Sequence, residues 1–125
     1  MKKRVSTSNA PAAIGPYSQA IIHNGLVYCS GQIPLDPETM NIVGEDAATQ
    51  AKQVMKNLSE VLKEAGSSFS KVIKCSIFLD TMDDFGKVNE VYGSFFDTAP
   101  PARETVAVQT LPKEVLVEIS CIAYI

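Results

Sequence analysis

Two extended segments near the end of the chain decide its fold: Pro100-Pro101-Ala102-Arg103-Glu104-Thr105-Val106-Ala107-Val108 and Val115-Leu116-Val117-Glu118-Ile119. Their apolar, β-branched residues predict two strands. Arg103 and Glu118 place a cation and a carboxylate inside these otherwise buried-strand patterns. Because the two prolines restrict the backbone before Arg103, its guanidinium is expected to be held in place. A fixed planar fork of donors suits a carboxylate or a phosphate, so an anionic small molecule is the first ligand to consider.

A purely structural role for Arg103 is the alternative. Most charged side chains are solvated or form surface pairs, and Glu104 and Glu118 are both available as partners. The residue pattern alone leaves these two interpretations of Arg103 open.

Length and composition predict one globular domain spanning residues 1–125, with 46% hydrophobic and 20% charged residues. The formal net charge of -3 argues against broad binding of nucleic acid, which depends on clustered lysine and arginine. The basic N-terminus is followed by no apolar run typical of a signal peptide, and no membrane span is visible. We therefore expect a cytoplasmic protein.

The three cysteines, Cys29, Cys75 and Cys121, are odd in number and lack the spacing of metal ligands. Each lies in an apolar, strand-like run, so we interpret all three as small buried hydrophobic residues. Neither a metal nor a cofactor is expected.

The first third of the chain predicts a short edge strand over residues 4–7, an ordered proline-rich loop over 10–18, and a hairpin. In the hairpin, Asn24-Gly25 forms the tight turn between strands 19–22 and 26–29. This places His23, the only histidine, in a solvent-exposed turn. Tyr17, at the end of the loop, is expected to lean over whatever the loop covers.

Beyond the hairpin, Ser30-Gly31 ends a strand, where a glycine would allow close approach of a ligand or form a bulge. A turn-rich connection over residues 34–44 precedes a helix over 47–65, capped by Asp46 and ended by Gly66.

The second half of the chain predicts a strand over residues 72–79, with Ile73, Cys75, Ile77 and Leu79 on one face. Thr81 and Asp84 resemble a capping box. A second helix follows, with an apolar stripe from Phe85 to Phe96 and Asn89 beside that stripe.

The element order predicts an α+β fold in which both helices pack on one face of a mixed sheet. The other face would still carry Phe78, Leu116 and Ile122, so we expect copies of the chain to bury it against each other. Glu118 lies on this same face, close to a subunit boundary.

These motifs together resemble the RidA/YjgF family of reactive intermediate deaminases over nearly the whole chain. The segments that carry the resemblance are 9–17, 30–34, 88–92, 101–103, 111–112 and 117–119. The resemblance implies a chorismate-mutase-like subunit in a homotrimer, with an active site in each cleft between subunits. It also implies hydrolysis of 2-imino acids, including 2-iminobutanoate and 2-iminopropanoate, to 2-oxo acids and ammonia.

By this resemblance, Arg103 would bind the substrate carboxylate and Glu118 would act on the water. The remaining residues of the site would be Tyr17, Ser30, Gly31, Asn89 and Thr105. Two positions depart from the family pattern: Thr105 stands where several relatives have a cysteine, and Pro100 stands where an aromatic residue is common. These departures bear on substrate preference and on the wall of the cleft.

The chemistry also fits the residues without the family name. An imino acid offers Arg103 a carboxylate, and its protonated C=N carbon is electrophilic enough for attack by water. Glu118 would take a proton from that water and return it to the departing ammonia, and general acid–base catalysis of this kind contributes roughly 10²–10⁴-fold. Neither a covalent nucleophile nor a metal is required.

The sequence leaves three alternatives to imine hydrolysis. A non-catalytic sensor of small 2-oxo or amino-acid carboxylates would use the same Arg103. A ribonuclease or translation inhibitor is disfavoured by the acidic balance and the single turn histidine. A holdase-like chaperone would need the second face of the sheet to be accessible.

Overall fold

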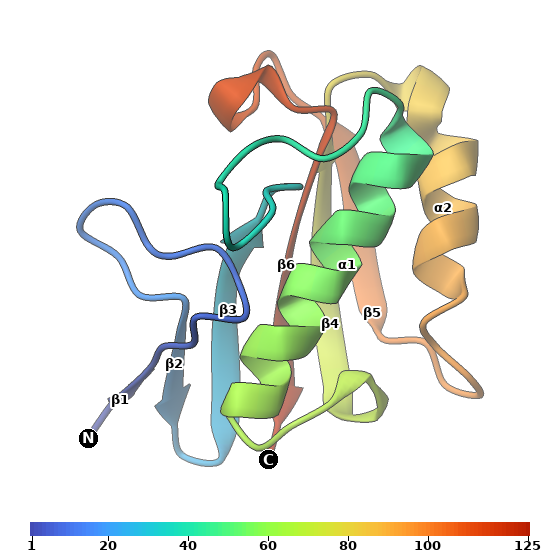
Figure 1. Cartoon of the computed structure of the whole chain (residues 1–125). Helices are drawn as coiled ribbons and strands as arrows, with labels where there is room; N and C mark the ends of the chain where they lie inside the picture. Colours follow the sequence, from blue (N-terminus) through green and yellow to red (C-terminus); the bar gives the residue numbers. More distant parts are fainter.

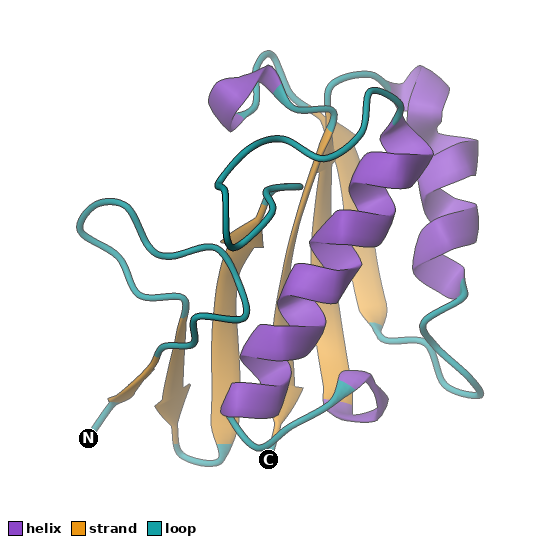
Figure 2. Cartoon of the chain, viewed as in Figure 1, coloured by secondary structure: helices purple, strands orange, loops and turns teal.

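The computed structural model describes residues 1–125 as one mixed sheet with two helices on one face (Figures 1 and 2). The strands are β1 (Lys3–Val5), β2 (Ala20–His23), β3 (Leu26–Gln32), β4 (Val72–Leu79), β5 (Ala102–Ala107) and β6 (Val117–Tyr124). The helices are α1 (Ala47–Glu64) and α2 (Phe85–Gly93). The strand order is β1-β2-β3-β6-β4-β5, and only β4 and β5 are parallel. The predicted α+β arrangement is confirmed.

The hairpin between β2 and β3 turns at Asn24 and Gly25, both with positive φ (51° and 77°), as a primed turn requires. His23 pairs with Leu26 at the base of this turn and is exposed, as predicted. The first edge strand is also present, although it begins and ends slightly earlier than the predicted residues 4–7.

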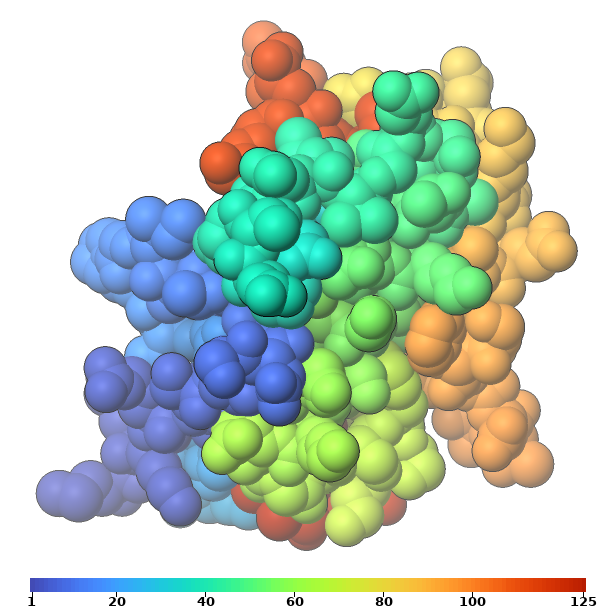
Figure 3. All heavy atoms as spheres, in the orientation of Figure 1, coloured from blue at the N-terminus to red at the C-terminus, as the bar shows by residue number.

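Helix α1 begins and ends where the sequence predicts. The Asp46 carboxylate accepts a hydrogen bond from the Thr49 backbone N–H (2.8 Å), and Gly66 adopts the left-handed conformation (φ 84°) just past the helix end. The apolar face of α1 packs on β3 and β6. The outer side of α1, in green, runs through the middle of the space-filling view (Figure 3).

The predicted alternation along β4 is wrong at its first two residues. The pairing of β4 with β6 shifts register between Val72 and Lys74, so Val72 is buried while Ile73 is 45% exposed. A bulge of this kind inserts one residue and reverses the sides that follow from simple alternation. From Cys75 onward the predicted faces hold.

The predicted capping box is only partly correct. The Thr81 hydroxyl accepts a hydrogen bond from the Asp83 backbone N–H (3.1 Å), but it caps a short 3₁₀ turn (Met82–Asp84) that precedes α2. Helix α2 ends at Gly93, and Phe95 and Phe96 pack against the core from the segment after it.

The three cysteines are buried and unpaired, and they lie side by side across the centre of the sheet. Cys121 on β6 is the neighbour of Cys29 on β3 and of Cys75 on β4. Hydrogen bonding to Cys29 and burial raise the pKa of the Cys121 thiol, and burial raises that of Cys75. All three cysteines are therefore buried core residues, as predicted.

No helix covers the second face of the sheet, which we call the open face. It carries partly buried Phe78 and Ile122 together with exposed Tyr28, Val106 and Tyr124. The prediction for Leu116 needs a correction, because this residue precedes β6 and packs against the buried core. Neither helix combines the length and hydropathy that crossing a membrane requires.

Candidate functional site: two half-sites on opposite faces of the sheet

Arg103 lies on β5 and faces the helices. Its neighbour on β4 is the buried Cys75, and its Nη1 donates a hydrogen bond to Asn89 Oδ1 on α2 (2.6 Å). No carboxylate lies within 4.0 Å of the guanidinium, since the one ion pair in the chain joins Lys74 and Glu104. A neutral partner, Asn89, therefore fixes the guanidinium. No carboxylate of the chain balances its positive charge, and most of its N–H donors remain available to a ligand.

Within the chain, Arg103 forms an ion pair with neither Glu104 nor Glu118. Glu104 points to the open face, where Lys74 Nζ lies 2.9 Å from its carboxylate and the Ser76 hydroxyl donates to it. These two contacts lower the pKa of Glu104, the Ser76 hydrogen bond having the larger effect.

A shallow cavity of about 370 Å³ opens beside Arg103. It is lined by Asn89, Tyr92, Gly93, Pro100, Pro101 and Arg103. Pro100, where an aromatic residue is common in the family pattern, thus forms part of the wall of this cavity. Thr105 lies two residues further along β5 on the same side, and its hydroxyl is buried without a hydrogen-bond partner. We call this group of residues the arginine half-site.

Glu118 lies on β6 and faces the open side of the sheet, opposite to Arg103. Its neighbour on β4 is Phe78. The carboxylate lines a cavity of about 510 Å³ whose other walls come from the N-terminal loop, the end of β3 and two further loops. The lining residues are Pro11, Ala12, Ile14, Tyr17, Ser30, Gly31, Gln32, Ile33, Leu35, Met40, Pro112, Lys113 and Glu118. We call this group the glutamate half-site.

Gly31 allows Glu118 to lie against the backbone of β3. A Cβ atom built on Gly31 would overlap Glu118 Oε2 and would lie 2.9 Å from its Cδ. The pairing of β3 with β6 shifts register between Cys29 and Gln32, so the bulge expected as the alternative at Gly31 is present, and the approach of a ligand to Gly31 stays a prediction. Burial raises the pKa of Glu118, and its side chain has no hydrogen-bond partner in the chain. A carboxylate whose pKa is raised by burial is a stronger base than an exposed glutamate.

The N-terminal loop that carries Tyr17 is held by one buried amide, that of Gln19. Its Nε2 donates to the carbonyls of Thr7, Ala10 and Pro11, and its Oε1 accepts from the Thr7 N–H. The Tyr17 side chain remains 52% exposed at the rim of the cavity. The loop is therefore rigid while its aromatic residue stays free to contact a ligand.

Ser30 lines the same cavity, but its hydroxyl is occupied. It donates to the Ser18 carbonyl (2.6 Å), which ties the loop to β3. The structure thus gives Ser30 a clear role in holding the loop, and its contact with a ligand stays a prediction.

The opposite wall is fixed by polar side chains of α1. Asn57 donates to the carbonyls of Ile33 and Leu35, and Gln50 accepts from the Leu116 N–H (2.8 Å) just before β6. The cavity wall and the start of β6 are therefore attached to the same helix.

The chain does not bring its two half-sites together. Arg103, Asn89 and Thr105 belong to the helix-covered side of β5, whereas Tyr17, Ser30, Gly31 and Glu118 surround a cavity on the open side of β3 and β6. The sheet separates the two groups.

Several residues of these half-sites were not anticipated. Phe85 and Tyr92 lie against Arg103, and Lys113 lines the glutamate half-site with a left-handed backbone (φ 55°). The 85–89–92 spacing on α2 marks one helix face and would have indicated the first two. No local signal identifies Lys113.

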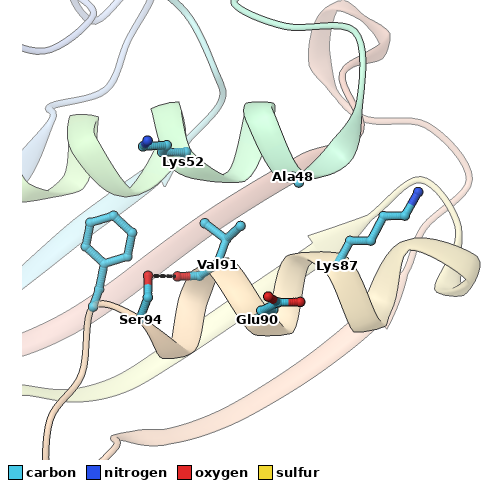
Figure 4. A pocket seen from close by; sticks show the side chains of 7 residues that line it. Ala48, Lys52, Lys87, Glu90, Val91 and Ser94 are labelled. Carbon is cyan, nitrogen blue, oxygen red and sulfur yellow. Dashed lines mark hydrogen bonds between the residues drawn. The ribbon is translucent and has the colours of Figure 1, made fainter.

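A further groove of about 420 Å³ separates α1 from α2 (Figure 4). Figure 4 shows the side chain of Val91 directed from α2 toward α1, while the Ser94 hydroxyl is bonded to the Val91 carbonyl (2.6 Å). Lys52 and Lys87 lie at separate positions along the groove. No residue of either half-site lines it.

Comparisons with known proteins identify the family. The family described as Endoribonuclease L-PSP matches residues 7–125, and the chain belongs to this family, which is also known as YjgF/RidA. A mouse relative called 2-iminobutanoate/2-iminopropanoate deaminase is 46% identical over 123 residues, covering 98% of this chain and 91% of its own.

Solved structures agree with the fold throughout. A Yersinia pestis protein of the conserved Rid family, described as being of unknown function, superposes with a TM-score of 0.97 at 47% identity, covering 100% of both chains. Escherichia coli TdcF with bound serine gives a TM-score of 0.94 at 40% identity, covering 98% of each chain. The predicted family is confirmed, and its members carry more than one functional description.

Proposed function

We propose that this protein hydrolyses reactive 2-imino acids to 2-oxo acids and ammonia, with 2-iminobutanoate and 2-iminopropanoate as the expected substrates. The observation that carries the proposal is the state of Arg103, a guanidinium fixed by Asn89 and left without a carboxylate partner. Such a group is a receptor for the carboxylate of a small anion. The name of the mouse relative supports the same reaction.

The proposed reaction needs one bound carboxylate and one group that exchanges protons. Arg103 binds the substrate carboxylate, while Glu118 removes a proton from water as the oxygen attacks the C=N carbon. The resulting carbinolamine carries hydroxyl and amino groups on one carbon. Glu118 then delivers the proton to the nitrogen. As the C–N bond breaks, the Glu118 carboxylate takes the hydroxyl proton so that the C=O bond forms, and this proton leaves with the ammonia as ammonium. Burial raises the pKa of Glu118, which strengthens its carboxylate as the base that takes the proton from water.

We also propose that each complete site forms between two copies of the chain, in a chorismate-mutase-like homotrimer. The arginine half-site and the glutamate half-site lie on opposite sides of the sheet, so one chain alone presents them in different directions. The uncovered apolar residues of the open face support association, because a stable monomer rarely exposes such a surface. In this arrangement Tyr17, Gly31 and Glu118 of one copy face Arg103 of its neighbour.

The test measures whether the protein removes the imino acid before a chemical trap can capture it. An amino-acid oxidase generates 2-iminobutanoate in the presence of semicarbazide, and the trapped semicarbazone is measured with and without the protein. We expect the wild-type protein to reduce the amount of trapped semicarbazone and the Arg103→Ala variant to leave it unchanged. Arg4→Ala is the matched control because Arg4 is the only other arginine of the chain and is exposed.

Two results would contradict the proposal. Unchanged trapping with wild type across several imino acids would exclude this reaction. Binding of 2-oxobutanoate without turnover, insensitive to Glu118→Gln, would favour the sensor function. Ribonuclease activity is less well supported, since the only histidine, His23, ends β2 beside the hairpin turn, away from the end of β3 that carries Ser30 and Gly31.

A further inference from the structure

We infer that Phe85 and Tyr92 of α2 are positioning residues that hold the Arg103 guanidinium in its anion-binding orientation, an inference that rests on the proposed function. Arg103 Cζ lies 5.6 Å from the ring centroid of Phe85 and 5.1 Å from that of Tyr92. Both distances fall within the range of about 6 Å over which a ring face attracts a cation.

These contacts and the Asn89 hydrogen bond come from one face of one helix. Phe85, Asn89 and Tyr92 are spaced by four and three residues, which brings their side chains together on α2. The Asn89 oxygen fixes Nη1 at 2.6 Å, while the rings restrict the guanidinium as a whole. The helix therefore limits both the position and the rotation of this group.

The Tyr92 ring is itself held by neighbouring aromatic side chains. Its centroid lies 4.8 Å from that of Phe96, which lies 5.5 Å from that of Phe69. Tyr92 is 4% exposed. Burial and the neighbouring Cys75 thiol raise the pKa of its hydroxyl, while its contact with the guanidinium is made by the ring. We therefore assign its role toward Arg103 to the ring.

The structural consequence is a guanidinium that is oriented before the ligand arrives. An arginine side chain otherwise loses considerable rotamer freedom when it binds an anion, and a fixed arginine avoids most of that loss. Removal of one ring should weaken binding of a carboxylate roughly 3- to 30-fold, given the usual strength of a cation–ring contact.

The test measures binding and Arg103 mobility apart from catalysis. Phe85→Leu and Tyr92→Leu are compared with wild type for their affinity for 2-oxobutanoate by calorimetry. Arg103 side-chain rotation is followed by ¹⁵N NMR of its guanidinium signals. Phe95→Leu is the control, because Phe95 packs on Phe69 and has no contact with Arg103.

Phe85→Leu and Tyr92→Leu are both expected to weaken binding of 2-oxobutanoate and to accelerate rotation of the Arg103 guanidinium, while Phe95→Leu does neither. Tyr92→Phe is expected to restore what Tyr92→Leu loses, since it restores the ring. The inference would be overturned if all three leucine variants changed the affinity and the rotation equally. It would also be overturned if the guanidinium still rotated slowly in both Phe85→Leu and Tyr92→Leu. If wild type binds 2-oxobutanoate tightly but turns over no imine, the proposed function fails while this inference stands.

Discussion

Replacement of Gly31 by alanine tests whether the glutamate half-site depends on one close contact. Gly31 does not adopt a left-handed conformation, so its backbone accepts alanine and the effect is steric. The added Cβ would overlap Glu118 Oε2 and would lie 2.9 Å from Cδ and 3.0 Å from Cγ. Ordinary contacts begin at 3.4 Å, so the Glu118 side chain must move by roughly 0.5–1.2 Å or change rotamer.

The expected cost falls on activity more than on stability. Because the obstructing group is the free end of a flexible side chain, the free energy of unfolding should fall by only about 1 kcal/mol. A displacement of this size at a reacting group reduces kcat by roughly 10- to 100-fold. Gly86→Ala is the control, since a Cβ there meets nothing within 4 Å.

The assay is the trapping measurement with wild type, Gly31→Ala, Glu118→Gln and the double variant. If the alanine acts by moving Glu118, it should reduce the rate in the wild-type background and have almost no further effect once Glu118 is glutamine. Equal reductions in both backgrounds would refute the reasoning, as would full activity of Gly31→Ala.

Burial raises the pKa of Glu118 above its ordinary value of 4.5, so the folded state holds the proton more tightly and stability falls as pH rises through the interval between the unfolded and folded pKa values. Glu118→Gln should therefore raise Tm relative to wild type at about pH 8 and not at about pH 4, and a pH-independent difference would contradict this. Gln19→Leu removes the four hydrogen bonds that hold the Tyr17 loop and should lower the free energy of unfolding by about 2–4 kcal/mol in urea titrations. An unchanged urea midpoint would show that the loop is held in another way. Ile122→Asp puts a charge on the open face and should reduce the mass measured by light scattering to that of one chain, with Ile42→Asp, at an exposed loop position, retaining the wild-type mass. A full-mass Ile122→Asp protein would place the interface elsewhere.

Much of the fold follows from local sequence signals. Asp46 and Gly66 mark the ends of α1, and Asn24-Gly25 marks the hairpin, because each residue type satisfies a specific backbone requirement at that point. The bulge that exposes Ile73 could not be predicted, since it depends on how β4 pairs with β6. The 3₁₀ turn before α2 likewise moved the cap away from the helix.

The site residues were predicted individually, but their arrangement was not. Alternation along β6 correctly placed Glu118 on the open face. The side of β5 that Arg103 occupies follows from parallel pairing with β4, which no local pattern specifies. The contact between Gly31 and Glu118 joins two strands far apart in the sequence, so it became visible only once β3 and β6 were adjacent.

We propose that each active site combines Arg103 of one copy with Glu118 of its neighbour. The most direct measurement mixes two inactive variants, Arg103→Ala and Glu118→Gln. Each would carry a different tag, and the two would be unfolded together and refolded at equal concentrations. The isolated mixed assemblies and the unseparated mixture are then assayed for 2-iminobutanoate hydrolysis.

In a closed ring of randomly mixed chains, about one quarter of the clefts would pair an intact Arg103 with an intact Glu118. We therefore expect the mixture to recover about one quarter of the wild-type rate, with neither variant active when refolded alone. If mixed assemblies form and remain as inactive as the separate variants, the two residues do not share a site between copies, and the claim is wrong.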